Sequence, residues 1–415
     1  MSDMAHSIAR LLSPEQARLL EAMAGAAARL GVDLFLVGGT VRDVLLERAS
    51  VDLDTVAVAP PEGFPSALAG EVGGEVLGES QFGTSKLRVG DTVVDLATAR
   101  RETYAHPGAL PVVAPGAIDE DLARRDFSIN AMAVPLSPGL HGQLLDPFGG
   151  ELDLRRRLVR ILHPNSFADD ATRILRAIRY SERLKFALEP STAELLQHHL
   201  AYLDRIKGDR VRHELERIFR EERAVAMLRR MRGDGVLSAI HKGLTIDDST
   251  LAKLGELQAG AGPGGPLVLL AAIAYSMVPA AVDGLVARLA MDGVWSRVAR
   301  DAARLGGMVE SLSQPDLRPS EIHALLSGID ERAVIGASIA AGRPIVARRL
   351  SRYEAEFRHL KTELTGDDLI ALGVPQGPRV GALLRELLAA RLDGSVTDAE
   401  GERQLVSKWL NDRNP

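Results

Sequence analysis

The spacing of apolar residues divides the chain into an early part of mixed pattern and a longer helical part. Residues 33–37 (DLFLV) form a short apolar run, and residues 51–58 (VDLDTVAV) alternate between apolar and polar, as a half-buried strand does. Residues 14–30 instead have helical periodicity and good helix formers. From about residue 153 onward the helical spacing persists. The pattern therefore predicts a mixed α and β region followed by a mainly helical remainder.

Turn residues locate further elements in the first part. Gly38-Gly39 interrupts the first apolar run, and residues 41–47 have the pattern of a helix start. Residues 86–89 and 92–97 flank Gly90-Asp91, a two-residue turn with glycine first. This arrangement predicts a β-hairpin.

Two long helices are predicted in the second part. Residues 167–185 have the periodicity of one continuous helix, with Ser166 as its N-cap and Asp169 in its first turn. Residues 209–231 have the same periodicity. Residues 259–266 (AGAGPGGP) are the clearest linker or loop in the chain.

Composition narrows the class of protein. The chain has 415 residues, enough for two or three domains, and no cysteine, which excludes disulfide-linked partners and thiolate metal sites. Any metal must be held by carboxylates or histidines. No apolar run is long enough to span a membrane, and the start (MSDMAHSIARLLSPEQ) lacks the apolar core of a signal peptide. We therefore expect a cytoplasmic protein with no membrane partner.

The distribution of charge favours a polyanionic partner more than the net charge of −6 does. Residues 151–232 contain 19 Lys plus Arg and 13 Asp plus Glu, whereas the whole chain has 50 and 56. A basic segment in an acidic chain can hold a nucleic acid locally. A solvated, arginine-rich helical surface would have the same composition, so charge leaves both interpretations open.

Two acidic residues in a strand pattern are the first candidate for chemistry. Asp52 and Asp54 are two residues apart, so a strand would place both carboxylates on one face and Leu53 on the other. Paired carboxylate oxygens suit Mg²⁺, which takes substrate phosphates as further ligands. Two surface acids on a solvent-facing strand would show the same pattern.

The segment LVGGTVRD, which precedes these acids, favours the chemical interpretation. Gly38 and Gly39 let a backbone approach a triphosphate, and Arg42 in the following helical turn can pair with phosphate oxygens. A G-x-G-x-x-G pattern is absent, so a dinucleotide-binding fold is not predicted. Residues 78–86 (GESQFGTSK) do not fit a P-loop, because two extra residues separate the second glycine from the lysine.

Five segments in order resemble the class II tRNA nucleotidyltransferases and the related bacterial poly(A) polymerases, which belong to the DNA polymerase β superfamily. The resemblance covers roughly residues 30–235, and five matches in sequence make it far more specific than one would be. The segments are LFLVGGTVRDVLL with DLD, RRDFSINAMA (124–133), DPFGGELDL (146–154), DDATRILRAIRY (169–180) and DRVRHELERIF (209–219).

The resemblance implies an α+β fold, in which a small nucleotidyltransferase-type sheet head is followed by a mainly α-helical neck, body and tail. The catalytic head would occupy residues 1–155. The neck, with its nucleotide-selecting helix, would occupy residues 156–235. An RNA-binding body and tail would occupy residues 236–415.

The resemblance also implies roles for particular residues. Asp52 and Asp54 would be the catalytic ligands of Mg²⁺, and Asp95, in the second strand of the predicted hairpin, is a candidate third carboxylate. One departure is visible, because the family often has Glu-Asp where this chain has Asp169-Asp170. The residues implied to bind nucleotide are Gly38, Gly39, Arg42, Arg125, Asp170, Arg173, Arg176 and Arg179.

The chemistry expected of Asp170 and Arg173 follows from their functional groups. Residues three apart on a helix are neighbours. A carboxylate accepts from the exocyclic amino group of cytosine or adenine, and a guanidinium donates to the adjacent ring acceptor. Guanine and uracil present a carbonyl where the carboxylate needs a donor, a mismatch worth about 1–3 kcal/mol. A structural ion pair would have the same spacing.

The implied function is addition of CCA to the 3′ end of tRNA from CTP and ATP. A-adding, CC-adding and poly(A)-polymerase activities are alternatives, and a catalytically inactive RNA-binding module is the alternative outside the enzymes. Residues 103–118 (TYAHPGALPVVAPGAI) are rich in proline and glycine, which predicts a mobile loop. In the family, such loops influence which nucleotides are added.

Overall fold

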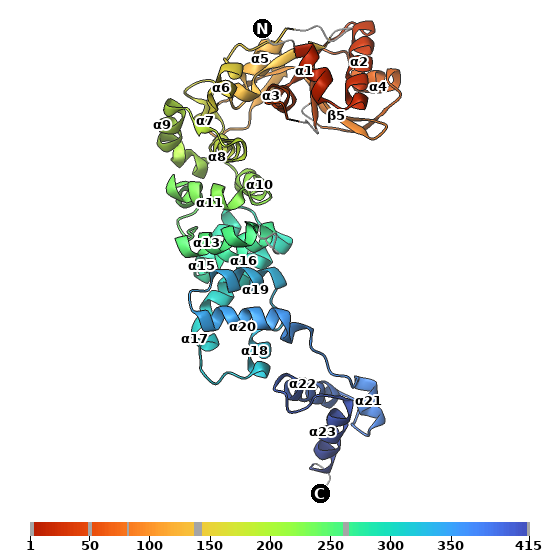
Figure 1. Ribbon diagram of the computed structural model, residues 1–415, viewed down its shortest axis with the longest axis vertical. Coiled ribbons are helices and arrows are strands. Elements are labelled where there is room, and N and C mark those ends of the chain that lie inside the picture. The colour runs from red at the N-terminus through yellow and green to blue at the C-terminus, as the bar shows by residue number, and fades with distance from the viewer. Residues whose placement is uncertain (1–3, 49–51, 81–82, 137–142, 260–264, 413–415) are drawn as a thin grey trace. The chain divides into compact units, whose positions relative to one another are not determined.

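The computed structural model forms two compact units, residues 1–207 and 208–415 (Figure 1). The boundary between the two units, at residues 207 and 208, falls within residues 156–235, the range predicted for the neck. The residues that the structure describes are 4–48, 52–80, 83–136, 143–259 and 265–412.

A mixed six-stranded sheet is the centre of the first unit, with strand order β3-β4-β5-β2-β1-β8. Strands β2 and β5 are parallel, whereas the other neighbours are antiparallel. The strands of this sheet are β1 (Asp33–Val37), β2 (Leu53–Val58), β3 (Glu75–Glu79), β4 (Thr84–Val89), β5 (Thr92–Thr98) and β8 (Ala133–Leu136). Two small sheets pair β6 (Arg100–Thr103) with β7 (Val112–Pro115) and β9 (Leu158–Val159) with β10 (Ala187–Leu188).

Helices surround this sheet and then continue the first unit. Helix α2 begins at Pro14, as the sequence predicts, and Ser13 before the helix forms a reciprocal capping box with Gln16 in its first turn. The helices are α1 (Met4–Leu11), α2 (Pro14–Arg29), α3 (Gly38–Leu45), α4 (Phe64–Glu71), α5 (Ile118–Ala123), η1 (Ser128–Asn130), α6 (Gly150–Arg156), α7 (Ser166–Asp169), α8 (Thr172–Leu184), α9 (Pro190–His199) and η2 (Leu200–Arg205).

The predicted hairpin is confirmed by the pairing of β4 with β5. Val89 and Thr92 are partners at its end, on either side of Gly90-Asp91. Gly90 has a φ of +57°, as a glycine-first turn requires. The hairpin joins the rest of the sheet through β5, which places Asp95 next to the strand that follows Asp52.

The prediction of one continuous helix over residues 167–185 is wrong. Helix α7 ends at Asp169, Asp170 has extended dihedral angles (φ −140°, ψ 98°), and α8 begins at Thr172. The Asp170 carboxylate accepts from both the backbone N–H and the hydroxyl of Thr172. Such local side-chain bonds compete with helical backbone bonds, which explains the break. The residue at the N-cap of α7 is Asn165 rather than Ser166.

The prediction of a mobile loop over residues 103–118 is also wrong in part. Val112–Pro115 forms β7, which pairs antiparallel with β6, and α5 begins at Ile118. The two valines of β7 favour extended backbone, and β6 supplies the missing hydrogen-bond partners. The turn is anchored as well, because Gly108 N–H donates to the Ala168 carbonyl at 3.1 Å.

The described residues of the second unit form helices and the connections between them. The predicted helix over residues 209–231 is two helices, because residues 220–223 (REER) form a turn between Phe219 and Ala224. The helices are α10 (Gly208–Phe219), α11 (Ala224–Gly233), α12 (Val236–Ile240), α13 (Asp248–Ala259), α14 (Pro266–Ala274), α15 (Pro279–Arg288), α16 (Gly293–Gly307), α17 (Val309–Leu312), α18 (Pro319–Leu326), α19 (Glu331–Ala340), α20 (Pro344–Ala355), η3 (Phe357–His359), α21 (Gly366–Ala371), α22 (Pro378–Leu392) and α23 (Ala399–Asn411).

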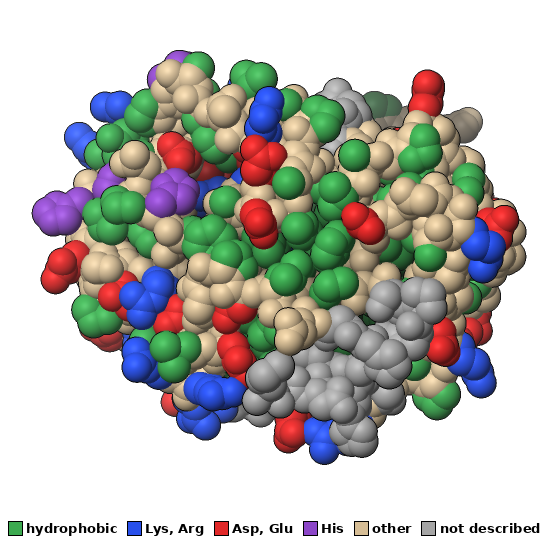
Figure 2. Space-filling view, turned by 90° about the horizontal axis from the view of Figure 1, so that it is seen from above, with side chains coloured by type: hydrophobic (Ala, Val, Ile, Leu, Met, Phe, Trp, Pro, Cys, Tyr) green, Lys and Arg blue, Asp and Glu red, His purple; other side chains and the backbone are tan. Residues whose placement is uncertain are grey.

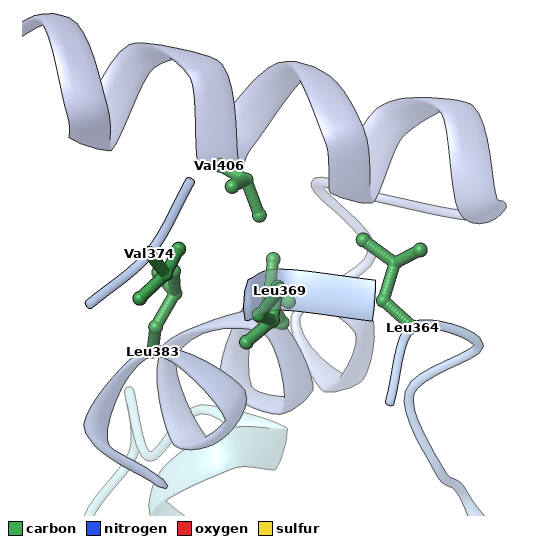
Figure 3. Packing of buried hydrophobic residues seen from close by; sticks show 6 residues of the cluster. Leu364, Leu369, Val374, Leu383 and Val406 are labelled. Atoms are coloured by element: carbon green, nitrogen blue, oxygen red, sulfur yellow. The ribbon is translucent and has the colours of Figure 1, made fainter. Parts of the chain in front are cut away.

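A separate small core holds the last three helices together. Leu369 on α21, Leu383 on α22 and Val406 on α23 point toward one another, and all are at most 1% exposed (Figure 3). The predicted linker over residues 259–266 lies largely outside the described residues, and α14 begins at its last residue, Pro266. Within the described part of the chain, no helix is both long and apolar enough to cross a membrane.

Candidate active site

Acidic residues on two neighbouring parallel strands form the centre of the candidate site. Asp54 on β2 and Asp95 on β5 are Cα partners in register, and partners in register project to the same face of a sheet. Burial and the charge of Asp95 raise the pKa of Asp54 above its usual value of 3.8, and the charge of Asp52 acts in the same direction. The charges of the three acids selected from the sequence therefore act on one another.

A threonine hydroxyl positions the two acids of the D-x-D segment through their backbone. Thr40 Oγ1 donates to the carbonyl oxygen of Asp52 at 2.9 Å and accepts from the backbone N–H of Asp54 at 3.0 Å. Thr40 is buried in α3, directly after the glycine pair. Sequence analysis did not select Thr40, although its place between the glycines and Arg42 was an available signal.

Lys86 on β4 places a positive charge beside the acidic residues. Its Nζ lies 2.7 Å from Oδ1 of Asp95, and this hydrogen bond raises the pKa of Lys86. The two side chains are 59% and 39% exposed, so the pair can open at little cost. Among the residues that the structure describes, no three acidic or histidine side chains are already gathered as a set of metal ligands.

Bare backbone at the start of α3 borders the acids. A Cβ on Gly38 would lie 2.7 Å from Arg125 Nη1, and a Cβ on Gly39 would lie 3.4 Å from Asp54 Oδ2. Gly38 also has a φ of +65°, which favours glycine. Because Gly38 and Gly39 have no side chains, Asp54 and Arg125 can both approach this stretch of backbone. Side chains at these two positions would fill the space between them.

Arg42 and Arg125 are each held by a carboxylate and by Asn130. Arg42 Nε and Nη2 donate to Asp43 at 2.9 and 3.0 Å, and Nη1 donates to Asn130 Oδ1 at 2.7 Å. Arg125 Nη2 donates to Asp121 at 2.9 Å, and Nη1 donates to the Asn130 carbonyl at 3.4 Å. Burial alone would lower the pKa of Arg42, but Asp43 outweighs burial and raises it. Both guanidiniums are thus oriented by hydrogen bonds.

A buried acid connects the RRDF segment to helix α8. Asp126 Oδ2 accepts from Arg176 Nε at 2.8 Å, and its Oδ1 accepts from Asn130 Nδ2 at 3.0 Å. Burial opposes ionisation, but Arg176 and Asn130 outweigh it, so the pKa of Asp126 lies below its usual value. Arg176 was predicted from the sequence as a site residue, but Asp126 and Asn130 were not, although both lie in the RRDFSINA segment.

Asp170 and Arg173 lie where α7 ends and α8 begins. Because Asp170 is in the break, the expectation that the two residues are neighbours on one helix is wrong. Asp170 Oδ1 accepts from Thr172 Oγ1 at 2.6 Å. Arg173 is 5% exposed and donates to Ser166 Oγ and to the Arg124 carbonyl, each at 2.7 Å. The guanidinium is therefore held by oxygens from two other segments.

Arg179, the last of the selected arginines, is buried on α8. Its guanidinium carbon lies 5.0 Å from the centroid of the Tyr180 ring. Arg42 and Arg176 lie over the same ring. The structure therefore brings three of the selected arginines to one tyrosine that sequence analysis did not select.

The charged side chains of the candidate site differ from those on the surface mainly in that they are buried. Figure 2 shows acidic and basic side chains interspersed over the face seen there, with hydrophobic side chains between them. Arg42, Asp126 and Arg173 are instead each less than 8% exposed. Burying a charge is costly unless it is paired and hydrogen-bonded, as these charges are.

Comparisons with known proteins identify the family of the chain. Residues 34–160 match the family "Poly A polymerase head domain", and residues 185–247 match "Probable RNA and SrmB-binding site of polymerase A". An A-adding tRNA nucleotidyltransferase of Halalkalibacterium halodurans is 32% identical over 97% of this chain and 95% of its own length. A CC-adding tRNA nucleotidyltransferase of Geobacter sulfurreducens is 31% identical over 98% and 99%. An A-adding relative from the same organism is 32% identical over 97% of this chain, which spans 48% of that relative's length.

Solved structures extend the likeness to the whole fold. A CCA-adding enzyme in an apo form has a TM-score of 0.83 and 27% identity, covering 98% of this chain and 99% of its own. The Thermotoga maritima CCA-adding enzyme complexed with tRNA has a TM-score of 0.79 and 27% identity, covering 98% of both chains. The fold and the acidic site define a nucleotidyltransferase head followed by helices, which confirms the predicted α+β fold. The chain belongs to the tRNA nucleotidyltransferase family.

Proposed function

We propose that this chain adds C, C and A to the 3′ end of tRNA from CTP and ATP, without a nucleic-acid template. The juxtaposition of Asp54 and Asp95 with Arg125 at the glycine pair carries the proposal. It combines acids suited to a divalent ion with a cation suited to phosphate. Relatives named A-adding, CC-adding and CCA-adding support the tRNA 3′ end as the acceptor.

The proposed reaction forms one bond and breaks another. The 3′-hydroxyl oxygen of the RNA bonds to the α-phosphorus of the nucleoside triphosphate, and the bond to the leaving pyrophosphate breaks. Asp95, beside Asp54, would accept the hydroxyl proton. Arg42 and Arg125 would bind phosphate oxygens, for which a guanidinium is well shaped.

Asp52 and Asp54 would hold Mg²⁺ in this reaction. The donors fit, because carboxylate oxygens are hard ligands. Burial, together with the charges of Asp95 and Asp52, raises the pKa of Asp54, and a bound cation would relieve the repulsion between these acids. Lys86 also shows that Asp95 attracts a positive charge. When bound, the ion would stabilise charge on the phosphate oxygens and lower the pKa of the attacking hydroxyl.

Asp170 and Arg173 would select the base. The carboxylate would accept from the amino group of C or A, and the guanidinium would donate to the adjacent ring acceptor. Arg173 is anchored by Ser166 and Arg124, so little ordering is needed when a base arrives. Because C and A share these two groups, one site can serve both.

Addition of A alone is the second candidate. Two of the relatives described above, both named A-adding, are 32% identical to this chain, which favours it. The base-reading chemistry is the same for both candidates, so the product must be measured.

The test uses three tRNA transcripts that end before the first C, after CC, and after CCA, each incubated with CTP and ATP, one of which is labelled. An enzyme that adds CCA extends the first with both nucleotides and the second with A, and leaves the third unchanged. Extension of the second transcript alone would identify an A-adding enzyme. No incorporation into any transcript would leave the inactive RNA-binding module and overturn the proposal.

A further inference from the structure

Tyr180 lies against three arginine side chains near the end of α8. The guanidinium carbons of Arg42, Arg176 and Arg179 are 5.4, 5.6 and 5.0 Å from its ring centroid. All three are within the distance at which a cation is attracted to an aromatic face. Phe127 supports the ring edge-on, with centroids 5.7 Å apart and an interplanar angle of 75°.

The ring also connects two parts of the first unit, because it contacts Arg42 on α3 and Arg176 on α8. Arg42 on α3 donates to Asn130, Asn130 donates to Asp126, and Asp126 accepts from Arg176 on α8. Tyr180 contacts the first and the last residue of this series. The four hydrogen-bonded side chains and the ring therefore form a closed loop that joins the start of α3 to α8.

A carboxylate in the place of the ring would hold the arginines differently. It would occupy their N–H groups and would repel an incoming phosphate. The face of an aromatic ring attracts a guanidinium but does not accept hydrogen bonds from the N–H groups at the edge of the guanidinium. A guanidinium is therefore oriented by the ring while its edge stays suited to phosphate oxygens.

We propose that Tyr180 is a positioning residue that holds the guanidiniums of Arg42, Arg176 and Arg179 for the triphosphate of the bound nucleotide. The ring acts through these arginines and does not itself contact the reacting atoms. The inference rests on the proposed function, since it takes the site to bind a nucleoside triphosphate.

The test measures binding of ATP, inorganic tripolyphosphate and adenosine by the full chain in the absence of RNA. Tyr180→Leu removes the aromatic face and should weaken binding of ATP and of tripolyphosphate about tenfold, which corresponds to about 1.4 kcal/mol. Binding of adenosine should change less than twofold, because it has no phosphate. A purely structural role would weaken all three ligands together.

Two further variants separate the ring from the hydroxyl and from general effects of truncation. Tyr180→Phe keeps the ring and should bind ATP within twofold of the natural chain. Tyr202→Leu removes another tyrosine whose ring lies near an arginine, Arg205, at 4.9 Å, and it should leave ATP affinity unchanged. Equal ATP affinity in Tyr180→Leu and the natural chain would overturn the inference, as would a Tyr180→Phe variant as weak as Tyr180→Leu.

If Tyr180→Leu does not fold, a substitution that keeps the shape of the ring tests the same inference. Pentafluorophenylalanine at position 180 keeps the ring but reverses the charge distribution of its face, so ATP should bind several-fold more weakly than to Tyr180→Phe. Equal affinity would overturn the inference. A natural chain that binds ATP but extends no tRNA transcript would instead contradict the proposed function, so the two failures are distinct.

Discussion

Buried carboxylates have different structural roles in the two units. In the first unit Asp126, whose side chain is 8% exposed, pairs with Arg176 next to the candidate site. In the second unit Glu402, whose side chain is 0% exposed, accepts from the backbone N–H of Leu364 at 2.7 Å and from Arg391 at 3.0 Å. Burying a charge costs several kcal/mol before it is paired. The buried carboxylate of the first unit orients an arginine next to the candidate site. The buried carboxylate of the second unit anchors the segment before α21.

Two other ion pairs of the second unit are exposed at both partners. Both partners of Arg300–Asp283 are more than half exposed, and in Arg343–Glu310 the side chains are 50% and 81% exposed. Such pairs are worth little to stability. The comparison therefore suggests that buried charge, more than the number of charges, marks the residues whose loss should matter.

The largest effect is expected at the acidic cluster. Asp54→Ala or Asp52→Ala should lower nucleotide incorporation by about a thousandfold or more while the fold remains intact, because charge stabilisation at the reacting phosphate is lost. Steady-state incorporation into a tRNA transcript measures the loss. Asp91→Ala, an exposed acid in the turn of the β4–β5 hairpin, is the matched control. Near-normal turnover by either site variant would remove that residue from the mechanism.

The two buried carboxylates test the comparison directly. Asp126→Ala and Glu402→Ala should each lower the free energy of unfolding by about 3 kcal/mol, because each leaves buried donors without their acceptor. Chemical denaturation measures the change. ATP affinity should fall in the Asp126 variant and stay the same in the Glu402 variant. If both variants lost ATP affinity equally, the proposed division of roles would be wrong.

A smaller effect is expected in base choice. Asp170→Ala should relax discrimination against UTP and GTP by about tenfold to a hundredfold, since it removes the acceptor for the amino group. Arg173→Ala should lose more overall rate, because it removes a charged, bidentate donor. Single-nucleotide incorporation with all four triphosphates separates the two. Full preference for CTP and ATP in the Asp170 variant would make the pair structural.

Asp54 should oppose stability while it supports activity. Its pKa is raised in the folded state, so the folded chain is penalised once pH exceeds that raised value, and the penalty disappears as pH falls to the ordinary value of 3.8. Asp54→Asn should therefore raise the free energy of unfolding at pH 7 by about 1 kcal/mol. The gain should vanish in acid. Denaturation across this pH range checks it, and a gain independent of pH would contradict the stated cause.

The smallest effect is expected at the surface of the second unit. Asp283→Ala breaks the exposed pair with Arg300 and should change the free energy of unfolding by about 0.5 kcal/mol or less. A loss comparable to that of Glu402→Ala would show that exposure does not separate the two kinds of ion pair.

The sequence by itself determined the local elements and the residue types of the site. Strand β1 has the predicted bounds, the β4–β5 hairpin follows its glycine-first turn, and α2 follows its helical periodicity. These features depend on side-chain alternation and turn chemistry within a few residues. Sequence also selected Asp54, whose environment is perturbed as expected of a functional acid.

Only the tertiary structure decided which of those residues meet. Arg42 reaches Asn130 across 88 residues of sequence, and Arg176 reaches Asp126 across 50. Periodicity also could not locate the break at Asp170, where a side chain competes with the helix for backbone hydrogen bonds. The physical reason is that pattern and propensity act over one or two turns of chain, whereas the pairing of buried charges depends on strand register and helix packing between distant segments.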